Sequence, residues 1–297
     1  MAAPGSSMPP AHSARRDPAW VRWLLTTLAV GVLTVLVVIP VICVFVEAFS
    51  RGVGTYLKNI FLDPDNRNAI LLTLTVAPIA VCCNVLFGLA AAWAIVRFRF
   101  PGRTLLTAMI DLPFAISPVV AGLMFVLLFG DLGYFGPWLK QNGIQILFST
   151  PGLILATTFV TLPFVARELI PLMEAIGPDE ELAALSLGAN SWQIFWRVTI
   201  PNIRWALLYG IILCNARAMG EYGAVYVVSG RIDGATNTMP LQVGTLFDGL
   251  NTPGAFALAS VLTMLAAVTL VIKVGVERLA RQQVQEAKAK QTAQIKE

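Results

Sequence analysis

The sequence predicts an all-α protein that crosses a membrane six times. Of its 297 residues, 57% are apolar and 13% are charged, and the charged share is about half of that found in soluble domains. Long uncharged runs recur along the chain, separated by short segments that hold most of the charges, glycines and prolines. A water-soluble globular domain does not fit this composition.

Six runs are each long enough to cross the hydrocarbon core as a helix, since about 20 apolar residues span about 30 Å. The first follows Arg15, Arg16 and Arg22 and so resembles a signal peptide. It continues too far and lacks a small-residue cleavage site, so we expect a retained helix. The expected spans are residues 21–49, 68–96, 104–130, 151–174, 204–229 and 254–276.

These spans divide the chain into three parts. We expect a disordered cytoplasmic N-terminus over residues 1–20, a transmembrane domain over 21–276, and a cytoplasmic C-terminal tail over 277–297 that is a solvated helix extension or disordered. The transmembrane domain includes a cytoplasmic loop at 177–204. The loops on the other side are too short to form separate domains.

The basic residues predict the orientation. One side of the six spans holds fifteen: Arg15, Arg16, Arg22, Arg97, Arg99, Arg103, Arg167, Arg197, Arg204, Lys273, Arg278, Arg281, Lys288, Lys290 and Lys296. The other side holds five: Arg51, Lys58, Arg67, Lys140 and Arg231. By the positive-inside rule both termini are cytoplasmic. The net charge of +4 then reflects membrane orientation and requires no nucleic-acid partner.

Few residues offer catalytic or metal-binding chemistry. The single histidine, His12, lies in the Pro/Ser/Ala-rich N-terminal stretch, and the four cysteines lie in apolar runs without CxxC spacing: Cys43, Cys82, Cys83 and Cys214. There is no phosphate-binding loop or nucleophile elbow. We expect no catalytic residue, metal or bound cofactor on this chain, and an energy source in another chain.

The segment 177–204 predicts two short helices joined by a turn. Asp179, Glu180 and Glu181 suit the first turn of a helix, where the dipole favours negative charge. Gly188 can adopt the left-handed conformation that ends it. The second helix is expected to begin near Asn190 or Ser191.

Aromatic residues mark the second helix. Trp192, Phe195 and Trp196 follow i, i+3, i+4 spacing and form an apolar stripe, and Pro201 is expected to stop the helix before the next span. An aromatic cytoplasmic loop indicates a protein partner.

The same segment resembles the EAA loop of ABC importer permeases, E-A-A-x3-G-x9-I-x-L-P. Ala183, Ala184 and Gly188 match, and Val198-Thr199-Ile200-Pro201 follows nine residues later, but Leu182 replaces the glutamate, with Glu181 one residue earlier. In that family the loop docks into a groove on a cytoplasmic ATPase. The resemblance implies that the coupling residues are Glu181, Ala183, Ala184, Gly188, Trp192 and Pro201. The alternative is an interfacial amphipathic loop without a partner.

Three further segments narrow the resemblance: DLPFAISPVVAGLMFVLLFG (111–130), FVARELIPLMEAI (164–176) and PNIRWALLYGIILCNARAMGEYGAVYVVSG (201–230). With the loop they resemble the W-type permease of sulfate/thiosulfate ABC importers over about residues 20 to 280, although GE[FY]GA (220–224) also occurs in molybdate permeases. The resemblance implies a T-type permease partner, two copies of an ATP-binding subunit carrying ATP and Mg, an external sulfate-binding protein, and a place in the inner membrane.

Residues of a translocation path are harder to identify. Pro118 and Gly122 permit a kink and close helix approach beside a gate, or are ordinary features of a packed helix. Arg217 is the thirteenth of 25 residues in the run Trp205–Ser229, and Glu221 follows one helical turn later. The two are either a structural ion pair, or Arg217 lies beside the path of a divalent anion. We expect Asp111 to be interfacial, and Arg167 with Glu168 to anchor a helix end.

Other functions stay open at this point. A permease for another oxyanion such as molybdate, an ATP-independent anion channel and a membrane-embedded enzyme are the alternatives. An enzyme needs an intramembrane nucleophile, base or metal site, and a channel needs no cytoplasmic docking loop.

Overall fold

The computed structural model describes residues 18–294, and side chains up to residue 278. The expected disorder of residues 1–20 falls almost wholly outside this range, as do residues 295–297 of the expected tail. Every regular element within the range is helical, so the predicted all-α class is confirmed.

The chain divides into two compact units, one up to Val46 and one from Glu47 onward. The first is the expected first span. Its helix begins as α1 (Ala19–Leu33), continues through the π-helical turn η1 (Thr34–Val38) and ends as α2 (Ile39–Ala48). Its apolar side chains are largely exposed on every side, as lipid-facing residues require.

A proline explains the widened turn in this helix. Pro40 follows η1 by two residues, and a proline ring clashes with the carbonyl four residues earlier in an α-helix. The π winding relieves that clash, so the helix continues through the proline.

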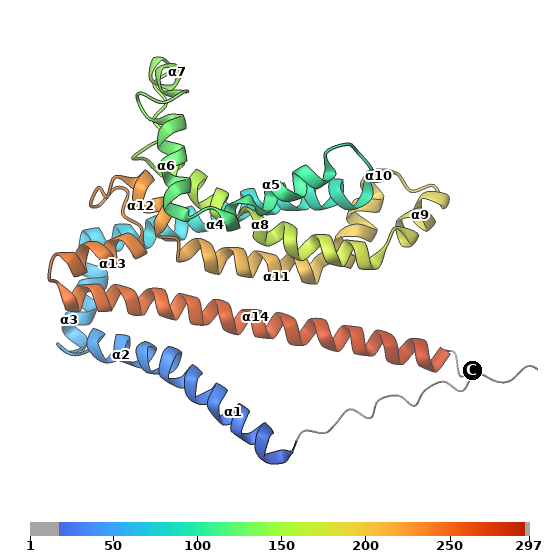
Figure 1. Cartoon of the computed structure of the whole chain (residues 1–297), viewed down its shortest axis with the longest axis horizontal. Helices are drawn as coiled ribbons and strands as arrows, with labels where there is room; N and C mark the ends of the chain where they lie inside the picture. The colour runs from blue at the N-terminus through green and yellow to red at the C-terminus, as the bar shows by residue number, and fades with distance from the viewer. Residues whose placement is uncertain (1–17, 295–297) are drawn as a thin grey trace, which may run out of the picture. The chain divides into compact units, whose positions relative to one another are not determined.

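The second unit is a helical bundle (Figure 1). It begins with α3 (Val53–Leu57), the π-turn η2 (Lys58–Leu62) and α4 (Pro64–Arg97). Next come α5 (Arg103–Ala115), α6 (Pro118–Phe129), α7 (Gly136–Gln141) and α8 (Thr150–Ile176). The segments α9 (Asp179–Ser186), α10 (Ser191–Ile194) and η3 (Phe195–Thr199) follow, and then α11 (Ile200–Met219), α12 (Gly223–Ser229), α13 (Met239–Asp248) and α14 (Thr252–Gln294).

Helices α4, α8 and α11 pack together at the centre of this bundle. Their core includes Val81, Val165, Leu169 and Cys214, all buried. A Cβ on Gly88 would lie 2.9 Å from Val165, so the glycine allows α4 and α8 to approach closely. Inside the core Asn84 donates a hydrogen bond to Thr161, at 2.7 Å, which links the two helices.

The bundle has two distinct ends. The C-terminal ends of α4 and α8 lie near α9 and α10 at one end, and α3 and α13 lie at the other (Figure 1). At the α13 end Arg231 contacts Asp248 at 3.2 Å, and this hydrogen bond raises the pKa of Arg231 above its ordinary value. We call the end with α9 and α10 the loop end.

The predicted count of six spans is not confirmed. Within residues 18–294, four helices are long and apolar enough to cross a membrane, or five if α5 and α6 count as one broken span. The third predicted span bends by 111° between these two helices. Ile116 is extended, and Ser117 directly precedes Pro118, a position where the α conformation is disfavoured. The fifth predicted span is broken at residues 220–222, between α11 and α12.

Candidate functional site

The loop segment, residues 177–204, folds as the two helices that the sequence predicts. Helix α9 carries three acidic residues in its first turn and ends at Ser186, two residues before Gly188, whose φ is +85°. Gly188 N–H donates to Leu185 O and Ala189 N–H to Ala184 O, each at 3.0 Å, which is the Schellman pattern. The space where a Cβ would point is open, so the glycine is required for its backbone conformation.

Helix α10 begins where predicted. Asn190 caps it by accepting a hydrogen bond from Gln193 N–H at 2.8 Å, and the Gln193 side chain accepts one from Asn190 N–H at 3.0 Å. This reciprocal capping box satisfies two backbone donors and fixes the turn that follows Gly188.

The prediction that Pro201 stops this helix is wrong. The chain remains helical from Ser191 through η3 and α11 to Met219. Pro201 again follows a π-helical turn by two residues, and the carbonyl with which its ring would clash belongs to Arg197, inside that turn. The loop segment is therefore joined directly to α11.

The loop segment exposes a set of large apolar side chains. Leu187 is 88% exposed and Trp192 68%, and the rings of Trp192 and Trp196 meet edge to face at 5.7 Å. Apolar side chains gathered outside the lipid-facing helices indicate a protein contact. We call this set the loop surface: Leu182, Leu185, Leu187, Trp192 and Trp196.

Phe195 attaches the aromatic stripe to the bundle. Its ring stacks on Trp93 of α4, with centroids 4.7 Å apart and planes 9° apart. Of the predicted stripe, one ring therefore packs inward, whereas Trp192 and Trp196 remain exposed.

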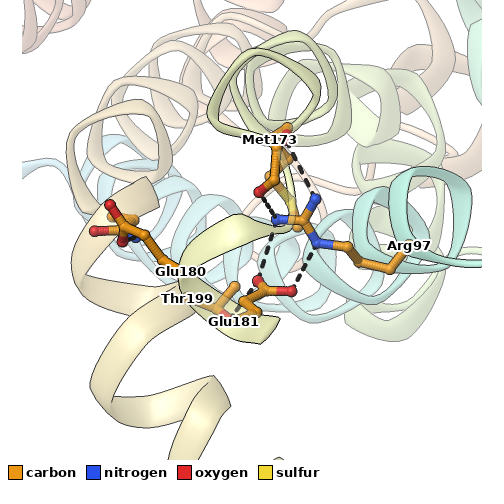
Figure 2. Close-up of polar contacts among 7 residues, drawn as sticks. Arg97, Met173, Glu180, Glu181 and Thr199 are labelled. Atoms are coloured by element: carbon orange, nitrogen blue, oxygen red, sulfur yellow. Dashed lines mark hydrogen bonds and ion pairs between the residues drawn. The ribbon is translucent and has the colours of Figure 1, made fainter. Parts of the chain in front are cut away.

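Glu181 points inward (Figure 2). Its Oε2 lies 2.8 Å from Nε of Arg97, and its Oε1 accepts hydrogen bonds from Arg97 Nη2 at 3.1 Å and from Thr199 Oγ1 at 2.8 Å. Beside it Glu180 accepts a hydrogen bond from Asn202. Of the other predicted coupling residues, Ala183 is exposed and Ala184 is half-buried.

The structure brings Arg217 and Glu221 together at 2.6 Å, as the sequence predicts. They do not share one helix, since Arg217 lies in the last turn of α11 and Glu221 in the break after it. The Glu221 side chain is 1% exposed and that of Arg217 36%. Glu221 Oε1 also accepts a hydrogen bond from Ala224 N–H at 3.0 Å, at the start of α12.

The other two predicted path residues lie at a helix contact. Pro118 begins α6, and Gly122 is buried where α6 crosses α12. A Cβ on Gly122 would lie 2.8 Å from Val227 and 2.9 Å from the carbonyl oxygen of Ala224. Here the glycine serves close packing of two helices.

Sequence reasoning missed three contacts that hold these regions together. Arg97 and Trp93 both meet the loop segment from α4, about a hundred residues away in the sequence. Arg167 pairs with Asp111 at 2.7 Å rather than with its neighbour Glu168. No local signal in the sequence points to these pairs, because each depends on how distant helices pack.

Residues 84–289 match the family model described as binding-protein-dependent transport system inner membrane component. The chain is 54% identical over 253 residues to the sulfate transport system permease protein CysW of Synechocystis, covering 85% of this chain and 91% of that one. It is 51% identical over 254 residues to CysW of Escherichia coli, covering 86% and 87%.

Two further comparisons extend this relationship. The sulfate transport system permease protein CysT of E. coli is 39% identical over 203 residues, covering 68% of this chain and 73% of that one. A chain from the crystal structure of a bacterial alginate ABC transporter, in complex with an alginate-bound periplasmic protein, superimposes with a TM-score of 0.72 at 18% identity. That match covers 89% of this chain and 94% of the other, and it shows that the fold is shared.

Proposed function

The chain belongs to the family of binding-protein-dependent transport system inner membrane components, as a W-type permease subunit of a sulfate ABC importer, and we propose that its loop segment couples sulfate translocation to ATP hydrolysis in a partner chain. It is a transport subunit and not an enzyme. ATP and Mg then belong to the partner, and this chain binds no cofactor of its own.

The exposed loop surface is the observation that carries this proposal. Its leucines and tryptophans stand on two capped helices, so a partner meets a preformed apolar surface with little ordering cost. Docking the loop surface into a groove on the ATP-binding subunit covers side chains that water would otherwise surround. Leu182, which occupies the glutamate position of the EAA pattern, adds to that apolar surface.

The remaining partners follow from the relatives. We propose a heteromeric complex of this chain, a T-type permease, two ATP-binding subunits and an external sulfate-binding protein. Similarity to both CysW and CysT supports two related permease chains in one importer.

We propose that the chain lies in the cytoplasmic membrane with the loop end and both termini facing the cytoplasm. The family description and the four to five apolar helices support a multi-pass inner-membrane protein. The sequence places fifteen basic residues on the side of the predicted spans that includes the loop end and five on the other side, which supports the orientation.

For the translocation path we propose that Arg217, held by Glu221, lies beside the route of the anion. A charge in a membrane-spanning helix is costly unless it faces protein or water. Arg217 is paired with Glu221, and its side chain is still 36% exposed. Its positive charge offsets the desolvation of a divalent oxyanion. Pro118 and Gly122 contribute by fixing the adjoining α6–α12 contact.

The docking role is tested by charging the loop surface. In L187D/W192D, carboxylates replace two exposed apolar side chains, so the ATP-binding subunit should no longer co-purify and ATP-driven sulfate uptake should be lost. The matched control is L250D, because Leu250 is as exposed as Leu187 but lies between α13 and α14. Normal co-purification and uptake in L187D/W192D would refute the assignment.

A further inference from the structure

Arg97, the last residue of α4, holds three elements together at the loop end (Figure 2). Its guanidinium faces both carboxylate oxygens of Glu181 on α9. Its Nη2 also donates a hydrogen bond to the carbonyl of Gly177 at 2.9 Å, and Nη1 donates one to the carbonyl of Met173 at 3.5 Å. Arg97 thus joins the end of α4 to the end of α8 and to the first turn of α9.

The pair is shielded from water. The side chains of Arg97 and Glu181 are 12% and 16% exposed. The space left beside them has a volume of about 10 Å³, at the lower limit for one water molecule. Because a planar guanidinium that faces a carboxylate with two nitrogens fixes both distance and orientation, the connection resists sliding and rotation.

The nearby pair Arg103–Glu174 shows the contrast. This pair links the start of α5, which follows α4, to the end of α8 at 3.0 Å. Its side chains are 43% and 50% exposed. Exposed pairs of this kind contribute little to stability or rigidity, because water screens them and both side chains move freely.

We propose that Arg97 is the positioning residue through which movement of the loop segment reaches the transmembrane bundle. The proposal rests on the proposed function, in which the ATP-binding subunit moves the loop surface. Glu181 sits on α9 beside Leu182 and Leu185 of that surface, so displacement of α9 pulls directly on Arg97 and hence on α4. Thr199, which donates to the same carboxylate, moves the start of α11 in step.

The apolar contact between Phe195 and Trp93 plays a different part. Two stacked rings keep η3 against α4, but they allow one ring to slide over the other. The Phe195–Trp93 contact keeps the loop segment attached to α4, whereas the Arg97–Glu181 pair fixes the position of the loop segment. Loss of the pair should therefore uncouple the complex without detaching the loop segment.

The test is the ratio of sulfate imported to ATP hydrolysed in the reconstituted complex. R97Q/E181Q removes both charges, so that no unpaired charge stays buried, and the amide oxygen introduced by E181Q can still accept from Thr199. We expect this variant to assemble and to hydrolyse ATP, with the ratio lowered by about tenfold or more. The control R103Q/E174Q should keep the wild-type ratio, and an unchanged ratio in R97Q/E181Q would overturn the proposal.

If R97Q/E181Q does not assemble, a cross-linked variant tests the proposed role of Arg97. In a chain whose native cysteines are replaced, R97C/E181C is joined by a reversible bifunctional thiol reagent matched in length to the ion pair. Cross-linking should restore the ratio, and reduction of the same sample should lower it again. If cross-linking leaves the ratio of sulfate imported to ATP hydrolysed unchanged, the proposal is overturned.

Failure of the proposed function would appear differently. A wild-type complex that imports no sulfate with ATP would refute the proposed function before any variant is compared. A wild-type complex that imports sulfate, beside an R97Q/E181Q variant with the same ratio, would refute only the role of Arg97.

Discussion

Glu221 has two roles at the break between α11 and α12. Its carboxylate accepts from Ala224 N–H, where the positive end of a helix dipole favours an anion, and it pairs with Arg217 at 2.6 Å. A carboxylate that is 1% exposed needs both partners, because an unpaired buried charge is strongly destabilising. The break therefore fixes where the Arg217 guanidinium lies.

The role of Arg217 in transport is tested with R217M/E221Q. The E221Q change keeps an oxygen acceptor for Ala224 N–H, and removal of both charges leaves no buried ion without a partner. We expect the double variant to assemble and hydrolyse ATP, with sulfate uptake at least about tenfold below wild type, because a divalent anion loses its compensating charge.

The single variant E221Q serves as the comparison. It releases Arg217 while keeping its charge, so it should lower the yield of the complex more than the double variant does. Full sulfate uptake by an assembled R217M/E221Q complex would show that the pair is only structural.

At the scale of elements, the contact between α6 and α12 depends on two glycines. A Cβ on Gly122 would meet Val227, and a Cβ on Gly223 would lie 2.9 Å from Cβ of Pro118. The missing side chain of each glycine thus leaves the space that the facing helix occupies. Because α6 follows the 111° bend, this contact holds the bent segment in place.

We expect G122V to separate these helices. The added side chain overlaps Val227 and the Ala224 carbonyl, and overpacking of this kind costs about 1–3 kcal/mol. The Tm of the purified complex should fall by several degrees, as followed by thermal unfolding in detergent. G275V is the matched control, because nothing lies within 4 Å of a Cβ on Gly275 in α14; equal Tm values for the two variants would contradict the packing role.

The elements that could be predicted from the sequence are those with local signals. The start of α10 follows from Asn190 and the end of α9 from Gly188, because capping and a left-handed glycine act within a few residues. Helix α8 follows from an apolar run of sufficient length. The effect of Pro201 could not be predicted, because a π-helical turn accommodates it without any distinctive residue pattern.

The candidate site was predictable only in part, because some of its contacts have no local signal in the sequence. The exposed tryptophans follow from helical spacing, but the inward direction of Glu181 depends on Arg97, which reaches it through the packing of α4 against α8. The break at residues 220–222 could not be predicted from the sequence, because the run 204–229 is apolar on both sides of the break.

At the scale of the whole molecule, the two ends of the bundle should lie on opposite sides of the membrane. Leu187 and Leu250 are equally exposed and lie at the loop end and at the α13–α14 turn. In a chain whose native cysteines are replaced, and without the ATP-binding subunit, L187C should react with an impermeant thiol reagent only from the cytoplasm and L250C only from outside. Reaction of both from one side would contradict the proposed orientation.

The most direct test of ATP-coupled sulfate import is sulfate uptake by proteoliposomes that contain the complete complex and the sulfate-binding protein. ATP is supplied or omitted in the compartment that faces the loop end. The prediction is uptake of sulfate that requires both ATP and the ATP-binding subunit, and that exceeds uptake of molybdate under the same conditions. Sulfate uptake by the permease chains alone, at the same rate without ATP, would contradict it and identify an anion channel. Uptake of molybdate in preference to sulfate would contradict the substrate.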